Sequence, residues 1–452
     1  MLTAQNTSYF RGGAYRSILT GCMAVLLASA TASAATSALA LSNVGFDQPG
    51  GCGTALITYT LGEAPVIVTV DVQTNTLDNG GGEWVSLGGD IVKTITGDFG
   101  IVRKTGTCQA RWMAAKDWPD HVVETGRIRA VVTAWATNAP PDWMVVGLKS
   151  DNDVRFYAAS NHVPEGVGSD LYKGDQLLMR RIPASGVVWT MGLTRKERAS
   201  GDTGVGDETN TPHRVMLTHD YFIGVYEVTQ CQYTNIGMSA ASGYSGYEDS
   251  WKRPASGLGI GNVRGNLPSP TAGYNVGSSS ACGRLREKTG GKIDFDIPTE
   301  AQWEFACRAG WDTAYNNGGD FVEAECKLVG WYSGNATNET VDSKVQTHPV
   351  GLKLPNAFGL YDMHGNVQEW CCALTTFGDA YVGTFADGYE NGAVTFDPVS
   401  GDTWSDVNKV ILRGGSVSHG AKTVRSGNRG WGTYTSHYDY NGFRLCCPAV
   451  FR

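Results

Sequence analysis

Three segments in the first third of the chain alternate apolar and polar residues with a period of two. They are Ala55–Leu61, Pro65–Val72 and Arg127–Ala136, and each is rich in β-branched residues. Turn-forming tracts such as Asp78–Gly82 separate segments of this kind. This pattern is typical of half-buried strands joined by short turns. The sequence therefore predicts an all-β domain over residues 42–150.

The spacing of these strands and turns resembles an immunoglobulin or fibronectin type III-like sandwich, a resemblance of pattern only. In this region we expect Trp84, Trp112, Trp118 and Trp135 to fill the core. The alternative is that one of them is exposed and binds carbohydrate. A module of this kind is usually a spacer or an adhesion unit.

The pattern changes after the turn-rich residues 151–175, which we interpret as a linker. Leu177–Gly192 is predicted to form a strand, a turn and a strand, and Val215–Thr229 two more strand-like pieces. Arg195–Thr211 is charged and rich in Gly, which predicts an exposed loop. Residues 176–452 therefore form a second predicted domain.

Two short helices are marked in this second domain by capping boxes. Thr229 with Gln232 begins one, and Thr299 with Gln302 begins a sharper one, which Gly310 ends. Trp303, Ala306 and Cys307 share one stripe of the latter helix. An apolar stripe at helical spacing indicates packing rather than a cofactor pocket. Because strands and helices mix here, the expected class is α+β.

The N-terminal 34 residues have the layout of a secretory signal peptide. Arg11 and Arg16 precede the apolar run Ile18–Ala30, and Ala32-Ser33-Ala34 offers a cleavage site. Leu19-Thr20-Gly21-Cys22 is similar to a lipoprotein box, but most of the apolar run follows the cysteine. The remaining sequence has no run of about 18 apolar residues that could span a membrane. We expect a protein secreted, periplasmic or held at the cell surface.

Charge and cysteine usage restrict the function further. The net charge of −8 gives no basic footprint for nucleic acid. Of 11 cysteines, ten follow the signal segment, and none forms a CxxC pair. In an exported protein this predicts two to four structural disulfides beside buried thiols rather than a zinc knuckle.

Seven motifs of the second half occur in one order that is characteristic of a known family. Together they span about 60% of the chain, which makes the set far more specific than any single motif. They are Arg181-Ile182-Pro183-Ala184 with Trp189-Thr190-Met191-Gly192, Tyr226-Glu227-Val228-Thr229, Pro298–Glu304, Asn356–Met363, Gly365–Trp370, Arg413-Gly414-Gly415-Ser416 and Gly442-Phe443-Arg444.

With these motifs the second domain resembles the formylglycine-generating enzyme, or sulfatase-modifying factor, family. The resemblance implies a fold related to C-type lectins. It also implies an activity, the oxidation of a cysteine in an unfolded sulfatase-type substrate protein to formylglycine with oxygen and copper. Family members bind copper through two cysteines a few residues after Arg413-Gly414-Gly415-Ser416, and soft thiolates suit Cu(I).

The sequence departs from the family at the copper ligands. Between Ser416 and Leu445 there is no cysteine. The first family position matches His419, and the second falls near Val424 or in a gap. Copper is therefore doubtful. If the protein is an enzyme, we expect Ser416, His419, Arg425 and Arg429 to line the cleft, with the two arginines orienting a peptide backbone or carboxylate.

The sequence also contains residues that could form other metal sites. Asp362, Gly365, Val367 and Glu369 offer an oxygen-only set that suits calcium, and the resemblance implies calcium there. The alternative is a turn in which Glu369 pairs with an arginine such as Arg413 or Arg444. His419 and His437, with tyrosines nearby, form a second possible site for iron or copper. Cys371-Cys372 and Cys446-Cys447 either supply a thiolate or form structural disulfides.

The absence of the family's two copper-binding cysteines also fits a different class of function. The loop over residues 416–441 is rich in Tyr, Ser, Gly, Asn and Trp, the residues of adaptable recognition surfaces. The alternative to a divergent oxidoreductase is therefore a non-catalytic, lectin-like module. Its ligand would be a protein or peptide, with carbohydrate also possible.

Overall fold

The structure is a computed structural model, and it divides the chain into two units, Met1–Ala40 and Leu41–Arg452. It describes residues 39–48, 53–75, 82–124, 126–193, 197, 212–239, 248–265, 276–319, 322–337, 345–375, 394–398, 409–433 and 436–451. The predicted signal peptide and nearly all of the loop 195–211 lie outside these residues. The described helices and strands all belong to the second unit.

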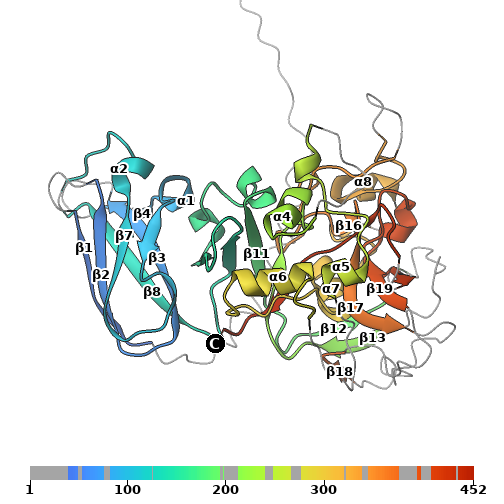
Figure 1. The fold of residues 1–452 in the computed structure, drawn as a ribbon, viewed down its shortest axis with the longest axis horizontal. Coiled ribbons are helices and arrows are strands. Elements are labelled where there is room, and N and C mark those ends of the chain that lie inside the picture. The colour runs from blue at the N-terminus through green and yellow to red at the C-terminus, as the bar shows by residue number, and fades with distance from the viewer. Residues whose placement is uncertain are drawn as a thin grey trace, which may run out of the picture. The chain divides into compact units, whose positions relative to one another are not determined.

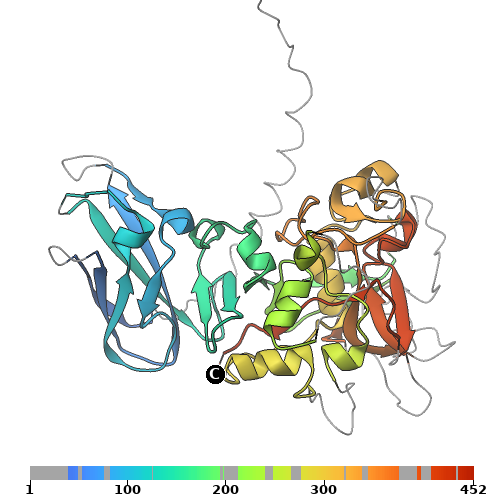
Figure 2. The same cartoon turned by 45° about the horizontal axis from the view of Figure 1, so that its top comes forward.

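Residues 41–136 form two antiparallel sheets, whose strands run alongside one another in both views (Figures 1 and 2). The predicted strands over residues 55–61, 65–72 and 127–136 are confirmed as β2, β3 and β8. One sheet has the order β1 (Leu41–Asp47), β2 (Ala55–Leu61), β7 (Gly106–Trp112), β5 (Ile95–Gly97). The other has β4 (Trp84–Ser86), β3 (Val66–Asn75), β6 (Gly100–Val102), with β8 (Ile128–Ala136) also on β3.

Burial in this region follows the alternation in the sequence. Along β2, every second side chain from Ala55 to Leu61 is buried. Of the four tryptophans expected in the core, however, only Trp112 is buried. The other three are partly exposed, and Arg129 stacks on Trp84 at 4.2 Å from its centroid. The immunoglobulin or fibronectin class of the region stays a prediction.

Residues 151–175 have regular structure. They contain β10 (Val154–Tyr157) and the 3-10 helices η1 (Ser160–His162) and η2 (Asp170–Lys173). The strand β10 is the edge of a five-stranded sheet, in the order β10, β9 (Trp143–Gly147), β11 (Gln176–Ile182), β14 (Tyr221–Gly224), β22 (Cys446–Pro448). The expected linker therefore connects two neighbouring strands of one sheet, β9 and β11, and adds the edge strand β10 to it. The domain limits stay a prediction.

Three smaller sheets complete the C-terminal part. The largest has the order β20 (Arg429–Thr433), β19 (Lys409–Arg413), β17 (Gln368–Thr375), β21 (Asn441–Gly442). The others are β12 (Val188–Met191), β13 (His213–Met216), β18 (Val394–Phe396) and the pair β15 (Gly330–Trp331), β16 (His364–Gly365). This arrangement confirms a sheet-rich α+β class, and the relation to C-type lectins stays a prediction.

The helices are short. They are α1 (Gly88–Ile91), α2 (Ala114–Asp117), α4 (Gln230–Asn235), α5 (Ile260–Val263), α6 (Ala281–Lys288), α7 (Glu300–Arg308) and α8 (Glu323–Val329), with 3-10 turns η3 (Ser250–Lys252) and η4 (Ala421–Val424). Both predicted capping boxes are present, at Thr229 with Gln232 and at Thr299 with Gln302. Each box satisfies two backbone N–H groups that a helix start leaves unpaired.

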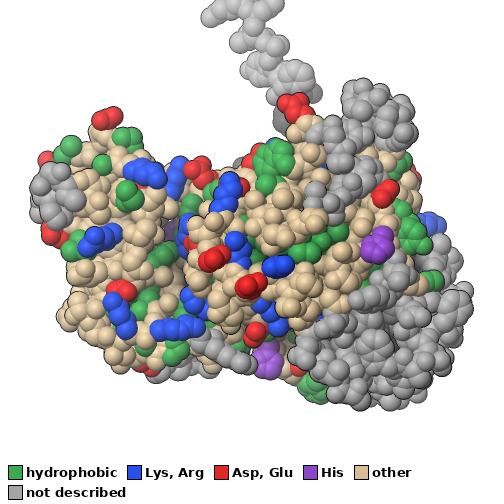
Figure 3. Space-filling model, in the orientation of Figure 1, with side chains coloured by type: hydrophobic (Ala, Val, Ile, Leu, Met, Phe, Trp, Pro, Cys, Tyr) green, Lys and Arg blue, Asp and Glu red, His purple; other side chains and the backbone are tan. Residues whose placement is uncertain are grey.

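The surface carries charges of both signs without a continuous basic area on the described part of the face in Figure 3. Among the described residues no helix is long and apolar enough to cross a membrane.

Candidate functional site

The loop after β19 folds back on itself through two glycines with positive φ. Gly414 has φ +84° and Gly415 φ +63°. A Cβ at Gly415 would lie 2.9 Å from Val424 Cγ1 and 3.0 Å from the Thr423 carbonyl oxygen. Glycine is required here for both backbone conformation and space. The loop therefore brings Val424, at the second family cysteine position, directly against the motif.

Ser416 and His419 are brought together inside this loop. His419 Nδ1 accepts a hydrogen bond from the Ser416 backbone N–H at 3.1 Å and lies 2.8 Å from its hydroxyl oxygen. Because Nδ1 accepts from the backbone, the neutral ring carries its proton on Nε2. Burial lowers the pKa of His419, and Ser416 is fully buried. These contacts between Ser416 and His419 hold the loop in its conformation.

The structure does not bring Arg425 and Arg429 to the same place. Arg425 Nη1 donates to the Lys422 carbonyl at 2.5 Å and to Asn428 Oδ1 at 3.2 Å. Arg429 makes two hydrogen bonds to Glu300, with Nε 2.7 Å from Oε1. Both guanidinium groups are buried. The four residues predicted to line one catalytic cleft are therefore divided between a local turn and a buried ion pair.

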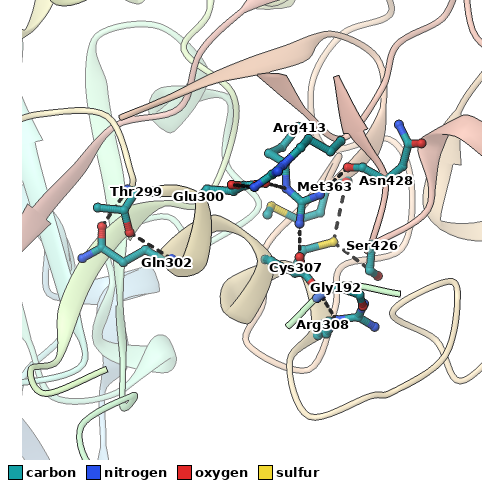
Figure 4. Close-up of polar contacts among 12 residues, drawn as sticks. Gly192, Thr299, Glu300, Gln302, Cys307, Arg308, Met363, Arg413, Ser426 and Asn428 are labelled. Atoms are coloured by element: carbon teal, nitrogen blue, oxygen red, sulfur yellow. Dashed lines mark hydrogen bonds and ion pairs between the residues drawn. The ribbon is translucent and has the colours of Figure 1, made fainter. Parts of the chain in front are cut away.

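Arg429 belongs to a chain of alternating charges in the interior. The order is Arg429, Glu300, Arg413, Glu304, Arg308, Glu197, and every neighbouring pair forms an ion pair. All six residues are buried. Arg413 also donates to the Asn428 carbonyl, as Figure 4 shows. This chain, which we call the buried charge chain, ties the loop after β19 to the helix α7.

The helix α7 supplies three members of the buried charge chain because of its spacing. Glu300, Glu304 and Arg308 are four residues apart and lie on one face. The capping box fixes the start of α7, and the C-cap Ala309 ends it in the left-handed region with φ +46°. Gly310, with φ +94°, follows as the predicted C′ glycine. Every residue of the helix but Gln302 is buried, which makes these charges internal.

A second buried ion pair involves Glu369 of β17. Arg444 donates to both of its oxygens, with Nη2 2.8 Å from Oε1, and the Trp303 indole donates to Oε2 at 2.7 Å. Arg444 Nη1 donates to the carbonyls of Gly224 and Val225, each at 2.9 Å. Of the two sequence interpretations of Glu369, the structure has the ion pair with an arginine.

Asp362 and Glu227 add two further buried carboxylates beside Arg444. Asp362 Oδ2 accepts from the Gly351 N–H at 2.6 Å, while its Oδ1 has no hydrogen-bond partner among the described residues. Glu227 accepts from Asn366 Nδ2 at 2.6 Å and from the Val367 N–H at 3.0 Å. Burial raises the pKa of Asp362 to about 6 and that of Glu227 well above its usual range.

The predicted calcium ligands fit this geometry only in part. The free oxygen of Asp362 is available to a hard cation, and the surplus of buried carboxylates favours one. Both oxygens of Glu369, in contrast, are bonded to Arg444, and a guanidinium repels a second cation. Among the described residues, no three His, Cys, Asp or Glu side chains are arranged to hold a metal.

A buried thiol, that of Cys307, and a buried imidazole, that of His364, lie next to each other close to Val424, and the sequence did not predict this pair. Cys307 Sγ lies 3.6 Å from Ser426 Oγ, 3.7 Å from the Met363 carbonyl oxygen and 3.9 Å from His364 Nε2 (Figure 4). Burial raises the pKa of Cys307 to about 12, so its thiol stays protonated. The position of Cys307 on the apolar stripe of the predicted helix indicated that its side chain is buried, but not that it lies beside His364.

His364 is fixed in its neutral form. Its Nδ1 donates to the Val424 carbonyl at 2.7 Å, and its Nε2 accepts from the Asn316 N–H at 3.1 Å. Burial lowers its pKa to about 4. Because Asn316 takes the Nε2 lone pair, the imidazole is not free to bind a metal. His364 therefore supports the loop at Val424.

The nine cysteines that the structure describes are free thiols. Cys371, Cys372, Cys446 and Cys447 are buried, so the disulfides expected from the sequence are not formed among the described cysteines. Cys52 lies outside the described residues.

The two histidines of the alternative metal site have different neighbours. The ring centroid of His419 lies 5.7 Å from that of Tyr440, and His437 lies against Gly259.

Comparison with known protein families identifies the domain that contains these ion pairs. Residues 180–448 match the family model of the sulfatase-modifying factor enzyme 1-like domain. This match covers more than half of the chain. The chain therefore belongs to the sulfatase-modifying factor family.

Three curated relatives illustrate the similarity. The chaperone protein LppX of Paenibacillus barcinonensis is 27% identical over 177 residues, which cover 34% of this chain and 61% of that protein. A formylglycine-generating enzyme of Thermomonospora curvata is 40% identical over 80 residues, 17% of this chain and 26% of that enzyme. The inactive C-alpha-formylglycine-generating enzyme 2 of Bos taurus is 29% identical over 203 residues, 44% and 56% respectively. The chain spans less than two thirds of each relative.

Replacing Glu304 by Gln tests the buried charge chain. Glu304 accepts from the Gly192 N–H and from both Arg308 and Arg413, so the loss of its charge leaves each of these buried guanidinium groups with one anionic partner, Glu197 or Glu300, in place of two. We expect the free energy of unfolding in urea to fall by about 3–5 kcal/mol. Lys149→Gln, which breaks an exposed pair with Asp175, is the control and should cost at most about 1 kcal/mol. If both variants lost the same free energy of unfolding, the ion pairs of Glu304 would not be buried.

Replacing His364 by Asn tests the neutral imidazole. The folded pKa of about 4 lies below the ordinary value of 6.5, so between these values the unfolded chain binds a proton that the folded chain does not. Stability from His364 is therefore present above about pH 6.5 and is lost as the pH falls. Between pH 7.5 and 4.5 the wild type should lose about 2–3 kcal/mol relative to the variant. A pH-independent difference would show that His364 is solvated.

Proposed function

We propose that the protein is an exported, divergent member of the sulfatase-modifying factor family, without copper-dependent cysteine oxidation. Its C-terminal domain binds a protein or peptide through the loop 416–441. The observation that carries this proposal is that two arginines of the loop already have hydrogen-bond partners in the interior. Arg425 and Arg429 are engaged with Asn428 and Glu300 in the interior, so neither is available to orient a substrate.

The residues at the two family cysteine positions do not fit copper. His419 offers an imidazole whose Nδ1 is already bonded to Ser416, and Val424 offers no ligand. The thiol of Cys307 lies behind Val424 with a raised pKa, and metal binding requires the thiolate. No step through copper is therefore assigned to this chain. The printed name of one relative, an inactive formylglycine-generating enzyme, agrees with such divergence.

Exposed aromatic rings support the binding role of the loop. Tyr438 is 53% exposed and stacks in parallel on Tyr440 at 5.5 Å between ring centroids, and Trp431 on β20 is 43% exposed. Tyrosine and tryptophan bury a large area at low cost in conformational entropy. The rings would serve a protein or peptide ligand and, as the lesser alternative, a sugar. Export rests on the signal-peptide pattern of residues 1–34.

An activity assay tests the divergence. The purified protein, supplied with Cu(I), oxygen and a cysteine-containing sulfatase-type peptide, should consume no oxygen and leave the peptide mass unchanged. The double variant His419→Cys with Val424→Cys should gain Cu(I) binding, because it restores both thiols. The control His437→Cys with Val424→Cys should not. Turnover by the wild type would overturn the proposal.

We also propose that calcium occupies the acidic interior, with Asp362 Oδ1 as the main side-chain ligand in place of Glu369. A bound ion would offset the surplus of buried carboxylates at Asp362 and Glu227. Chelation should lower the melting temperature by several degrees, and Asp362→Asn should abolish the effect of the chelator. Asp151→Asn, at an exposed position, is the control. A chelator-independent melting temperature would contradict the proposal.

A further inference from the structure

A cleft of about 400 Å³ opens in the C-terminal domain at a place that no motif predicted. Its walls come from the turn Leu217–Tyr221, the segment Asp294–Gln302, the strand β22, and the single residues Arg286, Cys372 and Asp397. The volume falls within the range of roughly 300–1,000 Å³ that is usual for small-molecule sites.

The cleft is separate from the loop 416–441. Thr299 and Gln302, at the start of α7, line the cleft, whereas Cys307, near the end of the same helix, lies behind Val424. Eight residues of helix separate Thr299 from Cys307, a distance of about 12 Å. A ligand in the cleft would therefore not touch the copper positions of the family.

The charges that line the cleft exclude an anion. Four aspartates line it against one arginine, Arg286. Three of the four have partners: Asp220 pairs with Arg181 at 2.7 Å, Asp296 with Arg264 at 2.8 Å, and Asp397 accepts from the Thr218 N–H at 2.8 Å.

Asp294 is the exception among these carboxylates. It is exposed and makes no hydrogen bond or ion pair with another described residue. Arg286 does not neutralise it, since its Nε donates to the Phe295 carbonyl at 2.7 Å and its Nη2 lies 4.0 Å from Asp296. The cleft thus keeps one unpaired negative charge that a ligand can reach.

The rest of the wall is mainly apolar, with His219, Thr299 and Gln302 as its other polar residues. Leu217, Ile297 and Pro448 contribute hydrocarbon surface, and Tyr221 contributes its ring, because its hydroxyl is already bonded to the Gln302 carbonyl at 2.6 Å. The thiol of Cys446 stays protonated because burial raises its pKa. An aliphatic chain matches such a wall, and an ammonium group matches Asp294.

We propose that this cleft binds an aliphatic amine of the polyamine class. The methylene chain lies along Leu217, Ile297 and Tyr221, and a terminal ammonium pairs with Asp294. The exposed Asp397 lies in the same wall and provides negative potential for a second ammonium group. This site is independent of the proposed binding loop.

Calorimetric titration of the purified protein with spermidine tests the site. We expect one spermidine per chain, and at least fivefold weaker binding to Asp294→Asn. The control is Asp151→Asn, which removes the same charge from an exposed aspartate that pairs with Lys288. Its affinity should equal that of the wild type.

A neutral diol of matching length should bind at least tenfold more weakly than spermidine. The proposal is overturned if spermidine does not bind, or if the diol binds equally well. It is also overturned if the two Asn variants lose affinity equally, because the amine would then respond only to the overall charge of −8. Asp294 is exposed, so its replacement should not disturb folding.

Discussion

The ion pairs of Arg413 with Glu300 and Glu304 are the interaction on which the C-terminal domain depends. Arg413 ends β19, and both glutamates lie on α7, so these contacts fix the loop after β19 against a buried helix. Three charges on a helix with almost no exposed residue would be costly alone, because each ion loses its hydration. Arg308, Arg429 and Glu197 extend the pairing until each buried charge has a partner of opposite sign.

This constraint decides how the functional motifs are interpreted. Residues that look catalytic in the sequence, such as Arg429, are used to neutralise the interior. In the part of the loop beyond the buried charge chain, Trp431 and Tyr438 are exposed. His419 and Val424 do not belong to the chain, so the ion pairs that hold the fold do not depend on these two positions.

Local patterns predicted local structure well. The alternation over Ala55–Leu61 gives a strand with those bounds, and the boxes at Thr229 and Thr299 begin helices as expected. The motif order predicted the family, which the match over residues 180–448 confirms. The strand β10 was not predicted from the turn-rich composition of residues 151–175, although it pairs with β9, the strand directly before it, because its 4 residues are too few to show a clear period.

The site was predicted less well. Glu300, Glu304 and Arg308 recur every four residues, and a charged helix face of this kind normally lies in solvent. Their burial depends on Arg413 and Arg429, more than a hundred residues away. Glu369 could be paired with either a cation or an arginine, and only the approach of Arg444 decides between them. Likewise Asp294 has no sequence motif, since the cleft around it forms only when distant strands meet.

A double-mutant cycle on Arg429 and Glu300, each replaced by Met, tests the central claim that the motif arginines hold the fold rather than a substrate. We predict that each single variant loses about 3–5 kcal/mol in the free energy of unfolding. The double variant should lose at least about 2 kcal/mol less than the sum of the two, because removing both partners leaves no unpaired charge. If Arg429→Met alone stays within about 0.5 kcal/mol of the wild type, as a surface substitution would, the guanidinium is not buried in an ion pair and the central claim is wrong.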